Sequence, residues 1–553
     1  MKLFSSPGLL ALALVACAPA QTVAAPAPAP AAPQSPGVQQ AAPALDTAPA
    51  NWWLLDPATE RFPGIGAERA YRELLAGKQP RKPVVVAILD TGVDVEHEDL
   101  DDNLWTNEDE VPGNGRDDDR NGYVDDVHGW NFIGGRDGRN VNQDTYELTR
   151  VYARLRARCA DATGAPQPGR TGCERYAEVR AEFDSTVQER REQLEQIRSI
   201  DMIVDRATQV LRAHLGADSL TLEKVQAIQS FRPDVTQAKQ IYLQLAAIRV
   251  TPEQIDEQRE SLENDLRYGL DPSFDPRPIV GDDYANPVDR SYGNTDLEGP
   301  NADHGTHVAG IAAAERGNGG INGIASPVRI MAVRIVPDGD ERDKDVANAI
   351  RYAVDNGAQV INMSFGKAYS PEKRLVDEAV RYADSRGVLL VHAAGNDGAD
   401  LDRDPNFPTP IYEDGGRARN WIEVGASSWP AADSLAASFS NYSRTRVDVF
   451  APGVDILSTV PGNRYERNQG TSMAAPVVTG IAALILAYYP ELSADEVKQV
   501  ILESATRYPD QRVLRPGSEG EQVRFGELSA TGGVVNAYAA LRLAEQRAAA
   551  KRR

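Results

Sequence analysis

The chain has 553 residues, with 59 lysines and arginines against 81 aspartates and glutamates and a formal net charge of −22. A length of this size predicts about two to four folded units. The acidic balance argues against nucleic-acid binding, which requires a basic face, and favours a soluble chain that repels polyanions.

Residues 1–50 have the features of an export signal followed by a tether. Residues 1–16 contain a lysine near the start and then a short apolar run, which is the outline of a signal peptide. Residues 17–50 are mostly alanine, proline and glutamine, and they cannot bury enough apolar surface to fold. We therefore expect an exported protein whose folded part follows an extended Ala/Pro-rich tether.

The sequence Leu-Val-Ala-Cys at residues 14–17 is similar to the lipobox of bacterial lipoproteins. The resemblance implies that Cys17 becomes the lipidated first residue and holds the protein at a membrane of the cell envelope. Ala18 is not the aspartate associated with inner-membrane retention, so the outer membrane is favoured. The alternative is ordinary cleavage after Ala18 or Ala20, which would give a secreted protein without an anchor.

Five apolar runs rich in β-branched residues alternate with helical stretches along the rest of the chain. A continuous apolar run is typical of a strand covered on both faces, and strand–helix alternation is typical of a parallel sheet with right-handed crossovers. The sequence therefore predicts an α/β fold with a doubly wound, mostly parallel sheet. The expected strands are residues 84–90, 328–336, 359–366, 387–396 and 421–427, and the intervening helices include residues 345–356 and 371–386.

Three polar side chains stand at the ends of these elements. Asp90 ends the first strand, and polar residues at the carboxyl ends of parallel strands lie where open α/β sheets place their sites. His304 starts a helix; with His307 it could form part of a metal site, but no third ligand accompanies the pair at zinc-ligand spacing. Ser472 opens a segment that is apolar on nearly every side through Tyr488. This segment predicts a buried helix with a hydroxyl at the positive end of its dipole.

Asp90, His304 and Ser472, in that chain order, resemble the catalytic residues of the subtilase family of serine endopeptidases. The resemblance covers about residues 83–504 apart from one large insertion, and it implies a subtilisin-like fold that hydrolyses peptide bonds in protein or peptide substrates. It implies that Ser472 is the nucleophile, His304 its general base and Asp90 the group that orients the imidazole. It also implies an oxyanion hole made by the Asn396 side chain and the Ser472 N–H. A binding module that keeps the fold without activity is the alternative, and the intact residues argue against it.

The same resemblance assigns two segments to substrate binding. One segment is implied to pair with the extended substrate by strand addition, and the other to form the opposite wall of the P1 pocket. Small residues in these walls favour a large apolar P1 side chain. The segments are Ser364, Phe365 and Gly366 for the first, and Ala393, Ala394 and Gly395 for the second.

The chain differs from better-known subtilases ahead of the first strand. Residues 51–82 form an N-terminal extension, in which Trp52 and Trp53 mark the beginning of the folded part. The stretch from Trp52 to Gln79 predicts one extended piece and a short helix. About 30 residues cannot form the usual inhibitory propeptide of domain size, so maturation through a propeptide is not expected.

The interval between Asp90 and His304 is far longer than a strand–helix unit requires, and its first part is an acidic loop. Oxygen-bearing side chains at alternate positions, followed by a glycine, are typical of a calcium loop. The alternative is a solvated acidic loop, since the bidentate glutamate of an EF-hand is absent. The candidate calcium ligands are Asp117, Asp119, Asn121 and Asp125.

Residues 145–270 form a large α-helical insertion, rich in Glu, Gln, Arg and Ala with apolar residues at helical spacing. Cys159 and Cys173 lie close together in it, and in an exported chain we expect them to form a disulfide, with two free thiols as the alternative. Both attachment points are expected on the loop-bearing face that holds the catalytic residues. The insertion is therefore either a lid that controls access to the site or a self-contained hairpin that binds a partner.

The expected organisation follows from these features. It consists of a signal peptide (residues 1–16), a lipidated tether (17–50), an N-terminal extension (51–82), a first part of the peptidase domain with the acidic loop (83–144), the helical insertion (145–270) and the rest of the peptidase domain (271–545).

Overall fold

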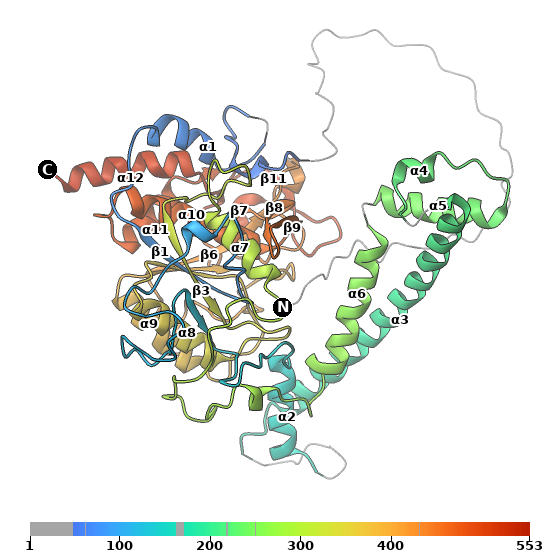
Figure 1. The fold of residues 1–553 in the computed structure, drawn as a ribbon, viewed down its shortest axis with the longest axis horizontal. Helices are drawn as coiled ribbons and strands as arrows, with labels where there is room; N and C mark the ends of the chain where they lie inside the picture. Colours follow the sequence, from blue (N-terminus) through green and yellow to red (C-terminus); the bar gives the residue numbers. More distant parts are fainter. Residues whose placement is uncertain (1–47, 61, 162–170, 217–218, 249, 431) are drawn as a thin grey trace, which may run out of the picture.

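The computed structural model describes residues 48–60, 62–161, 171–216, 219–248, 250–430 and 432–553. The predicted signal peptide, the predicted lipidation site Cys17 and all but the end of the predicted tether lie outside these residues. The described chain forms an α/β body and a helical arm that stands beside it (Figure 1).

A nine-stranded sheet runs through the body. Its strands pair in parallel, except that β10 and β13 pair antiparallel at one edge. The predicted α/β fold with a mostly parallel sheet is therefore confirmed. In spatial order the strands are β10 (Thr506–Arg507), β13 (Gly533–Val534), β7 (Val449–Pro452), β6 (Trp421–Ser427), β5 (Leu389–Ala393), β4 (Val360–Met363), β1 (Val84–Asp90), β3 (Val328–Arg334) and β2 (Gly129–Asn131).

Helices cover both faces of the sheet, because successive side chains of a strand point to opposite sides. On β1, Val86 and Ile88 pack in one hydrophobic cluster, whereas Ala87 and Leu89 pack in another. The sheet is doubly wound, as predicted. The first cluster is covered by α7 (Asp303–Ala313), α10 (Thr471–Tyr488), α11 (Ala494–Glu503) and α12 (Ala537–Lys551), and the second by α8 (Asp343–Asp355) and α9 (Lys373–Ser385).

Helix α10 lies at the centre of the first layer, and each of its residues is buried. By length and composition it could cross a membrane, and it is the one such helix in the described part of the chain. However, 89% of its apolar window is buried inside the body. A helix that is apolar all round and enclosed in this way is the core helix of a large domain.

The arm is built from helices joined by short connections. Its longest helix runs its whole length, and two others pack along it (Figure 1). Their apolar side chains form small separate clusters, one containing Leu194 and Ile255 and another containing Leu211 and Val235. Because isolated helices are marginal in water, this packing stabilises them. The arm comprises α2 (Glu147–Cys159), α3 (Tyr176–Leu215), α4 (Leu222–Gln226), α5 (Pro233–Ala247), α6 (Pro252–Asn264) and the short turn η5 (Asp265–Gly269).

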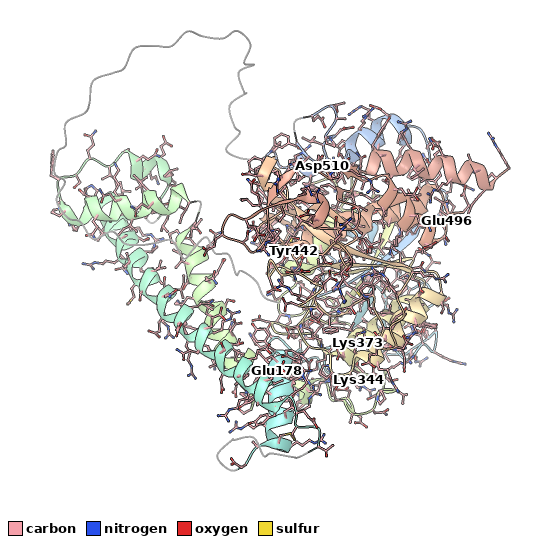
Figure 2. All side chains as sticks on the ribbon, turned by 180° about the vertical axis from the view of Figure 1, so that it is seen from behind. Glu178, Lys344, Lys373, Tyr442, Glu496 and Asp510 are labelled. Atoms are coloured by element: carbon pink, nitrogen blue, oxygen red, sulfur yellow. A yellow bond between two sulfur atoms is a disulfide. The ribbon has the colours of Figure 1, made fainter. Side chains whose placement is uncertain are left out.

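The predicted disulfide between Cys159 and Cys173 is present, with Cα atoms 5.6 Å apart. It joins the end of α2 to the segment before α3, so it closes the connection at the foot of the arm. In the chain-entropy description, a loop of about 15 residues closed in this way stabilises the fold by about 3 kcal/mol. Figure 2 labels Glu178 on α3 at this foot and Lys344 in the adjoining part of the body.

The N-terminal extension packs firmly into the body. Trp52 and Trp53 are 0% and 1% exposed, and the Trp52 indole N–H donates to the Asp455 carbonyl at 3.3 Å. Arg467 donates to the Ala48 carbonyl, also at 3.3 Å. The extension contains η2 (Trp52–Leu54), α1 (Ala67–Ala70) and η3 (Tyr71–Leu75), and it packs near the hairpin of β8 (Ile456–Val460) and β9 (Arg464–Asn468).

The remaining elements are short. They are the hairpin of β11 (Arg512–Leu514) with β12 (Gln522–Arg524), and the turns η4 (Asp101–Asn103), η6 (Arg277–Ile279), η7 (Ala432–Ser434) and η8 (Phe525–Glu527).

Candidate active site

The three predicted catalytic side chains come from the ends of three elements. Asp90 is the last residue of β1, His304 lies in the first turn of α7, and Ser472 lies in the first turn of α10. His304 Nδ1 and Asp90 Oδ1 are 2.6 Å apart. His304 and Ser472 both line one cleft of 1440 Å³. The fold therefore brings together residues that are far apart in the chain.

The close approach of α7 to the end of β1 depends on a glycine. A Cβ atom on Gly305 would lie 2.0 Å from the Gly92 carbonyl oxygen, so a larger residue would push the helix away. The Gly305 N–H donates to Thr91 Oγ1 at 3.3 Å. The imidazole of His304 consequently reaches the carboxylate of Asp90 directly.

The two histidines of α7, His304 and His307, lie in different surroundings. Asp90 is 1% exposed; its Oδ1 also accepts the Thr91 N–H, while its Oδ2 has no hydrogen-bond partner among the described residues. The Asp90 carboxylate thereby holds the imidazole of His304 in a fixed orientation. His307 differs, because burial lowers its pKa to about 3 and its Nε2 faces the carbonyls of Ile456 and Glu466 at 3.1 Å. His304 and His307 thus have separate partners, which argues against a shared metal.

The position of Ser472 depends on a proline one turn later. Pro476 has no N–H, so the Ser472 carbonyl lacks the donor that a helix would normally provide. Ser364 Oγ donates to that carbonyl instead, at 2.8 Å. Asn362 in turn donates to Ser364 Oγ at 3.0 Å. The end of β4 and the start of α10 are therefore locked together beside the nucleophile.

The predicted oxyanion group Asn396 follows β5 and lines the same cleft. Its Oδ1 accepts the Thr471 N–H at 2.8 Å and the Thr471 hydroxyl at 3.0 Å. With the oxygen held in this way, the amide Nδ2 is left to donate elsewhere. The Ser472 N–H belongs to the first turn of α10, where N–H groups have no partner within the helix. Both predicted oxyanion donors are thus available at one place.

The predicted substrate segments follow β4 and β5, which are neighbours in the sheet. Ser364, Phe365 and Gly366 line the cleft, as do Ala393 and Gly395. Ala394 differs from the expectation, because it is fully buried and packs with Leu401 and Phe450 in another hydrophobic cluster. Successive residues of an extended segment point to opposite sides, so Ala394 faces away when Ala393 faces the cleft.

A buried histidine that the sequence did not single out supports the first of these segments. His392 is 0% exposed, and its Nε2 lies 2.9 Å from the Phe365 carbonyl oxygen, to which an N–H at that position donates. Its Nδ1 lies 2.8 Å from the Glu423 carboxylate. A histidine inside a strand gives no local signal of such a role.

The acidic loop contains a cluster of three carboxylates whose ligand atoms lie within 4.8 Å of one another, formed by Glu110, Asp119 and Asp126. Asn107 and Asn121 each donate to both Asp119 and Asp126, at 3.0 Å. Burial raises the pKa of Asp126 to about 6. Hard oxygen ligands gathered at this spacing suit calcium, and a cation would relieve the burial of charge. The residues present therefore fit a calcium ion.

Two of the predicted calcium ligands have other partners. The Asp117 carboxylate accepts the N–H groups of Asn121 and Gly122, at 3.0 and 2.9 Å. The Asp125 carboxylate accepts the N–H groups of Asn114 and Gly115, at 3.1 and 2.9 Å. These side chains shape the loop from within, as short acidic side chains commonly do in turns. Glu110 and Asp126 were missed because one lies before the loop repeat and the other just after it.

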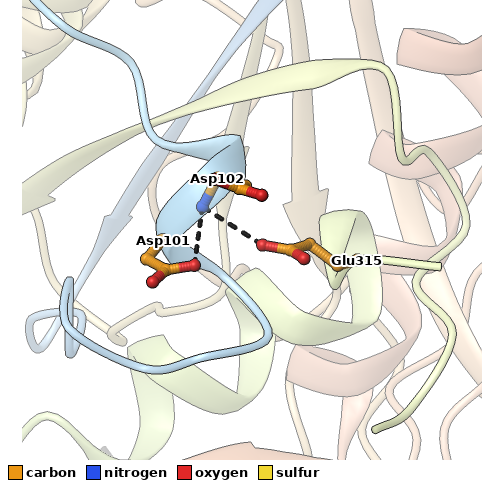
Figure 3. Close-up of side chains that lie close together, drawn as sticks. All are labelled: Asp101, Asp102 and Glu315. Atoms are coloured by element: carbon orange, nitrogen blue, oxygen red, sulfur yellow. Dashed lines mark hydrogen bonds between the residues drawn. The ribbon is translucent and has the colours of Figure 1, made fainter. Parts of the chain in front are cut away.

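A second acidic group, at the surface, consists of Asp101, Asp102 and Glu315 (Figure 3). The Asp102 N–H donates to Asp101 Oδ1 at 2.8 Å and to Glu315 Oε1 at 3.1 Å. Asp101 and Asp102 are exposed, unlike the buried Glu110 and Asp126. Asp101 and Asp102 stay hydrated and need no cation to offset buried charge, so this group is a control for the first.

The foot of the arm is joined to the substrate segment by buried charges. Lys367, directly after Gly366, is 1% exposed at its side chain and pairs with Glu147 of α2 at 3.0 Å and with Asp343 at 2.9 Å. Burial alone would raise the pKa of Glu147, but Lys367 and Arg150 together hold it well below its usual range. Removing one partner of such a buried pair costs about 3–5 kcal/mol. These buried ion pairs therefore hold the foot of the arm against the proposed substrate segment.

Comparison with known proteins agrees with this geometry. A family profile described as the subtilase family matches residues 81–520. A thermophilic serine proteinase from Bacillus sp. (strain AK1) is 44% identical over 238 residues, which cover 43% of this chain and 53% of that protein. Subtilisin DY from Bacillus licheniformis is 38% identical over 220 residues, which cover 39% of this chain and 74% of that protein.

Among solved structures, a protease from Pseudoalteromonas arctica is similar at 29% identity and a TM-score of 0.36, over 44% of this chain and 70% of that one. The sequence alignments with these two relatives cover less than half of this chain. The family profile, in contrast, spans most of the chain, and on this match the chain belongs to the subtilase family.

Proposed function

We propose that this chain is a serine endopeptidase that hydrolyses peptide bonds in proteins or peptides. The observation that carries the proposal is the 2.6 Å contact between His304 Nδ1 and Asp90 Oδ1, at a cleft that Ser472 also lines. Membership of the subtilase family supports the same reaction. A fold kept for binding alone would not need to bury this carboxylate against the imidazole.

Family membership and the Asp90–His304 contact support the following reaction. As Ser472 Oγ attacks the scissile carbonyl carbon, His304 Nε2 accepts the hydroxyl proton, and Asp90 stabilises the imidazolium that forms. The carbonyl oxygen becomes an oxyanion, to which the Asn396 amide and the Ser472 N–H donate. His304 then gives the proton to the leaving amine as the C–N bond breaks. Water next attacks the acyl carbon while His304 takes a proton from it, and this proton passes to Ser472 Oγ as the ester bond breaks and the acid leaves.

The test is labelling with a fluorophosphonate probe beside hydrolysis of a fluorogenic peptide. Ser472→Ala should abolish labelling and lower kcat by about 10⁴–10⁶, because the catalytic residues act as a unit. Ser199→Ala, an exposed serine on α3, is the control and should behave as wild type. Wild-type activity in a folded Ser472→Ala variant would refute the assignment.

We also propose that Glu110, Asp119 and Asp126 hold a calcium ion with help from Asn121. Support comes from the burial of the cluster and the raised pKa of Asp126. The ion would offset two of the three carboxylate charges and fix the loop against α8, where the Tyr352 hydroxyl donates to Asp126 at 2.7 Å. Its effect would be on stability.

We propose further that the protein is exported and held at the cell envelope through a lipid on Cys17. The residues 14–17 and the Ala/Pro-rich stretch support this location. The Cys159–Cys173 disulfide supports export as well, because disulfides persist in oxidising compartments. The alternative is secretion without an anchor.

The arm is proposed to be a lid. Residues of α3 and α6 line the same cleft as His304 and Ser472, so the arm faces the site. A self-contained hairpin for partner binding would not need the buried pairing of Glu147 with Lys367.

A further inference from the structure

The arm supplies one wall of the catalytic cleft. From α6, Gln254, Glu257, Gln258 and Ser261 line the cleft, and their spacing places them on one face of the helix. The apolar residues of α6, such as Ile255, pack against the rest of the arm. From α3, the lining residues Glu182, Thr186 and Arg190 are four positions apart and share a face in the same way.

The cleft carries a surplus of negative charge. Ten carboxylates line it, against four cationic side chains. Each of the four cations has a partner: Arg190 with Asp265 at 3.0 Å, Arg334 with the Thr91 carbonyl at 2.8 Å, Lys367 with Glu147 at 3.0 Å, and Arg467 with Asp455 at 2.9 Å. The surplus is therefore presented to whatever enters the cleft.

Carboxylates line the cleft on both sides, Glu257 from the arm and Glu466 from the body. Burial and repulsion by Glu466, followed by that of neighbouring acids on α6, raise the pKa of Glu257. Glu466 lies on β9 of the body, so the repulsion acts between the arm and the body. Arg464 pairs with Glu466 at 3.0 Å, but both side chains are more than half exposed, and such a pair is weak. Opposing acidic walls favour a cationic occupant.

Resting on the proposed endopeptidase function, we propose that the arm wall is a specificity site for cationic segments of the polypeptide substrate, with Glu257 and Glu260 of α6 as its charged residues. A lysine- or arginine-bearing segment threaded between arm and body neutralises both walls. The amide and hydroxyl groups of Gln254, Gln258 and Ser261 lie among these charges and can bond peptide groups of any sequence.

The spread of these carboxylates favours a polypeptide over a metal ion. Among the described residues, the acidic groups whose ligand atoms lie within 4.8 Å of one another do not include Glu257, Glu260 or Glu466. A metal needs convergent ligands, whereas an extended cationic chain carries its charges apart. The substrate class that fits is an unfolded, lysine- or arginine-rich protein segment.

The test uses two fluorogenic peptides with the same scissile core, one flanked by lysines and the other by glutamines. With wild-type enzyme, kcat/KM should be higher for the lysine-flanked peptide, and this preference should fall as salt is raised. Glu257→Gln/Glu260→Gln should reduce the ratio of kcat/KM for the lysine-flanked peptide to kcat/KM for the glutamine-flanked peptide by about 2- to 20-fold. Glu192→Gln/Glu195→Gln removes the same charge from exposed positions of α3 outside the cleft, and it should change neither rate.

Binding supplies a readout that needs no catalysis. Anisotropy of a labelled lysine-flanked peptide on Ser472→Ala should give a lower Kd than the glutamine-flanked peptide, and Glu257→Gln/Glu260→Gln in that background should remove the difference. Equal rates and equal binding for the two peptides would overturn the specificity site while leaving the endopeptidase function standing. Absence of hydrolysis of either peptide by wild type would instead refute the proposed function, and the binding result would still decide the site.

Discussion

At the scale of single residues, an exchange of hydrogen bonds positions the nucleophile. Pro476 removes one helical donor, and the Ser364 hydroxyl replaces it at the Ser472 carbonyl. The replacement ties the first turn of α10 to the segment proposed to hold the substrate. Ser364 therefore links the proposed substrate segment to Ser472, the proposed nucleophile, through one side chain.

The raised pKa of Asp126 makes the free energy of unfolding depend on pH in a definite direction. Burial raises its pKa from the usual 3.8 to about 6, so in the absence of a cation the folded state binds a proton more tightly than the unfolded chain. The proton on Asp126 stabilises the folded state by up to about 3 kcal/mol below about pH 4. This stabilisation is lost as the pH rises through about 6. A bound cation should cancel the loss.

We therefore expect calcium to raise the melting temperature by several degrees at pH 8 and by less at pH 5, because a ligand of the folded state stabilises it. Differential scanning fluorimetry with calcium or chelator measures this. Asp119→Ala/Asp126→Ala should abolish the calcium effect, whereas Asp101→Asn/Asp102→Asn in the surface group should retain it. An equal calcium shift in all three proteins would place the ion elsewhere.

At the scale of elements, the arm is an insertion whose foot is joined by a buried ion pair to the segment proposed to bind substrate. Glu147 begins α2 and pairs with Lys367, and the Tyr369 hydroxyl donates to Glu182 of α3. A deletion that removed Glu147 would leave a buried lysine short of a partner and would confuse loss of the lid with loss of the fold. The informative deletion keeps residues 147–158 of α2 and all of η5 and removes the helices between them.

Replacing residues 159–264 by a Gly/Ser linker should raise cleavage of a folded protein relative to cleavage of a short peptide, because the arm limits the width of what enters the cleft. The two cleavage rates are measured with a stable folded protein domain and with a fluorogenic peptide. The melting temperature of the variant checks that the body is intact. An unchanged ratio in a folded variant would favour the partner-binding arm instead.

Strands and catalytic residues could be predicted from the sequence because their signals are local. The run ending in Asp90 has the β-branched composition of a buried strand, and Ser472 opens a helix apolar on all sides. Glu110, in contrast, joins Asp119 and Asp126 through the folding of the loop, which no spacing rule describes. Ala394 was predicted to line the P1 pocket but packs in a hydrophobic cluster instead. The sequence does not show which of two successive residues in an extended segment points into the cleft.

The same limit applies between elements. Lys367 and Glu147 are 220 positions apart, so their pairing has no signature in either segment. Periodicity predicts a helical insertion but not which helix face meets the cleft, since the cleft is made by another part of the chain. The acidic wall of the arm could be recognised only once both parts were in place.

At the scale of the whole molecule, the proposed location depends on the N-terminal cysteine. Mass spectrometry of the membrane fraction should find Cys17 as the first residue and carrying acyl chains. Cys17→Ala should move the protein from the membrane to the soluble fraction while peptide hydrolysis per molecule stays the same, because the active site lies in the body. An unmodified Cys17, or a mature chain that begins after it, would favour secretion.

The packing of Trp52 and Trp53 sets a limit on trimming from the N-terminal side. Their indoles are enclosed by the body, and removing a buried tryptophan side chain costs about 3–5 kcal/mol. We therefore expect a peptidase that shortens the leading stretch to stop before Trp52, because both indoles are buried in the body. A soluble form released in this way would keep Trp52, Trp53 and the proposed catalytic residues. Detachment would therefore change the location of the enzyme and leave its reaction unchanged.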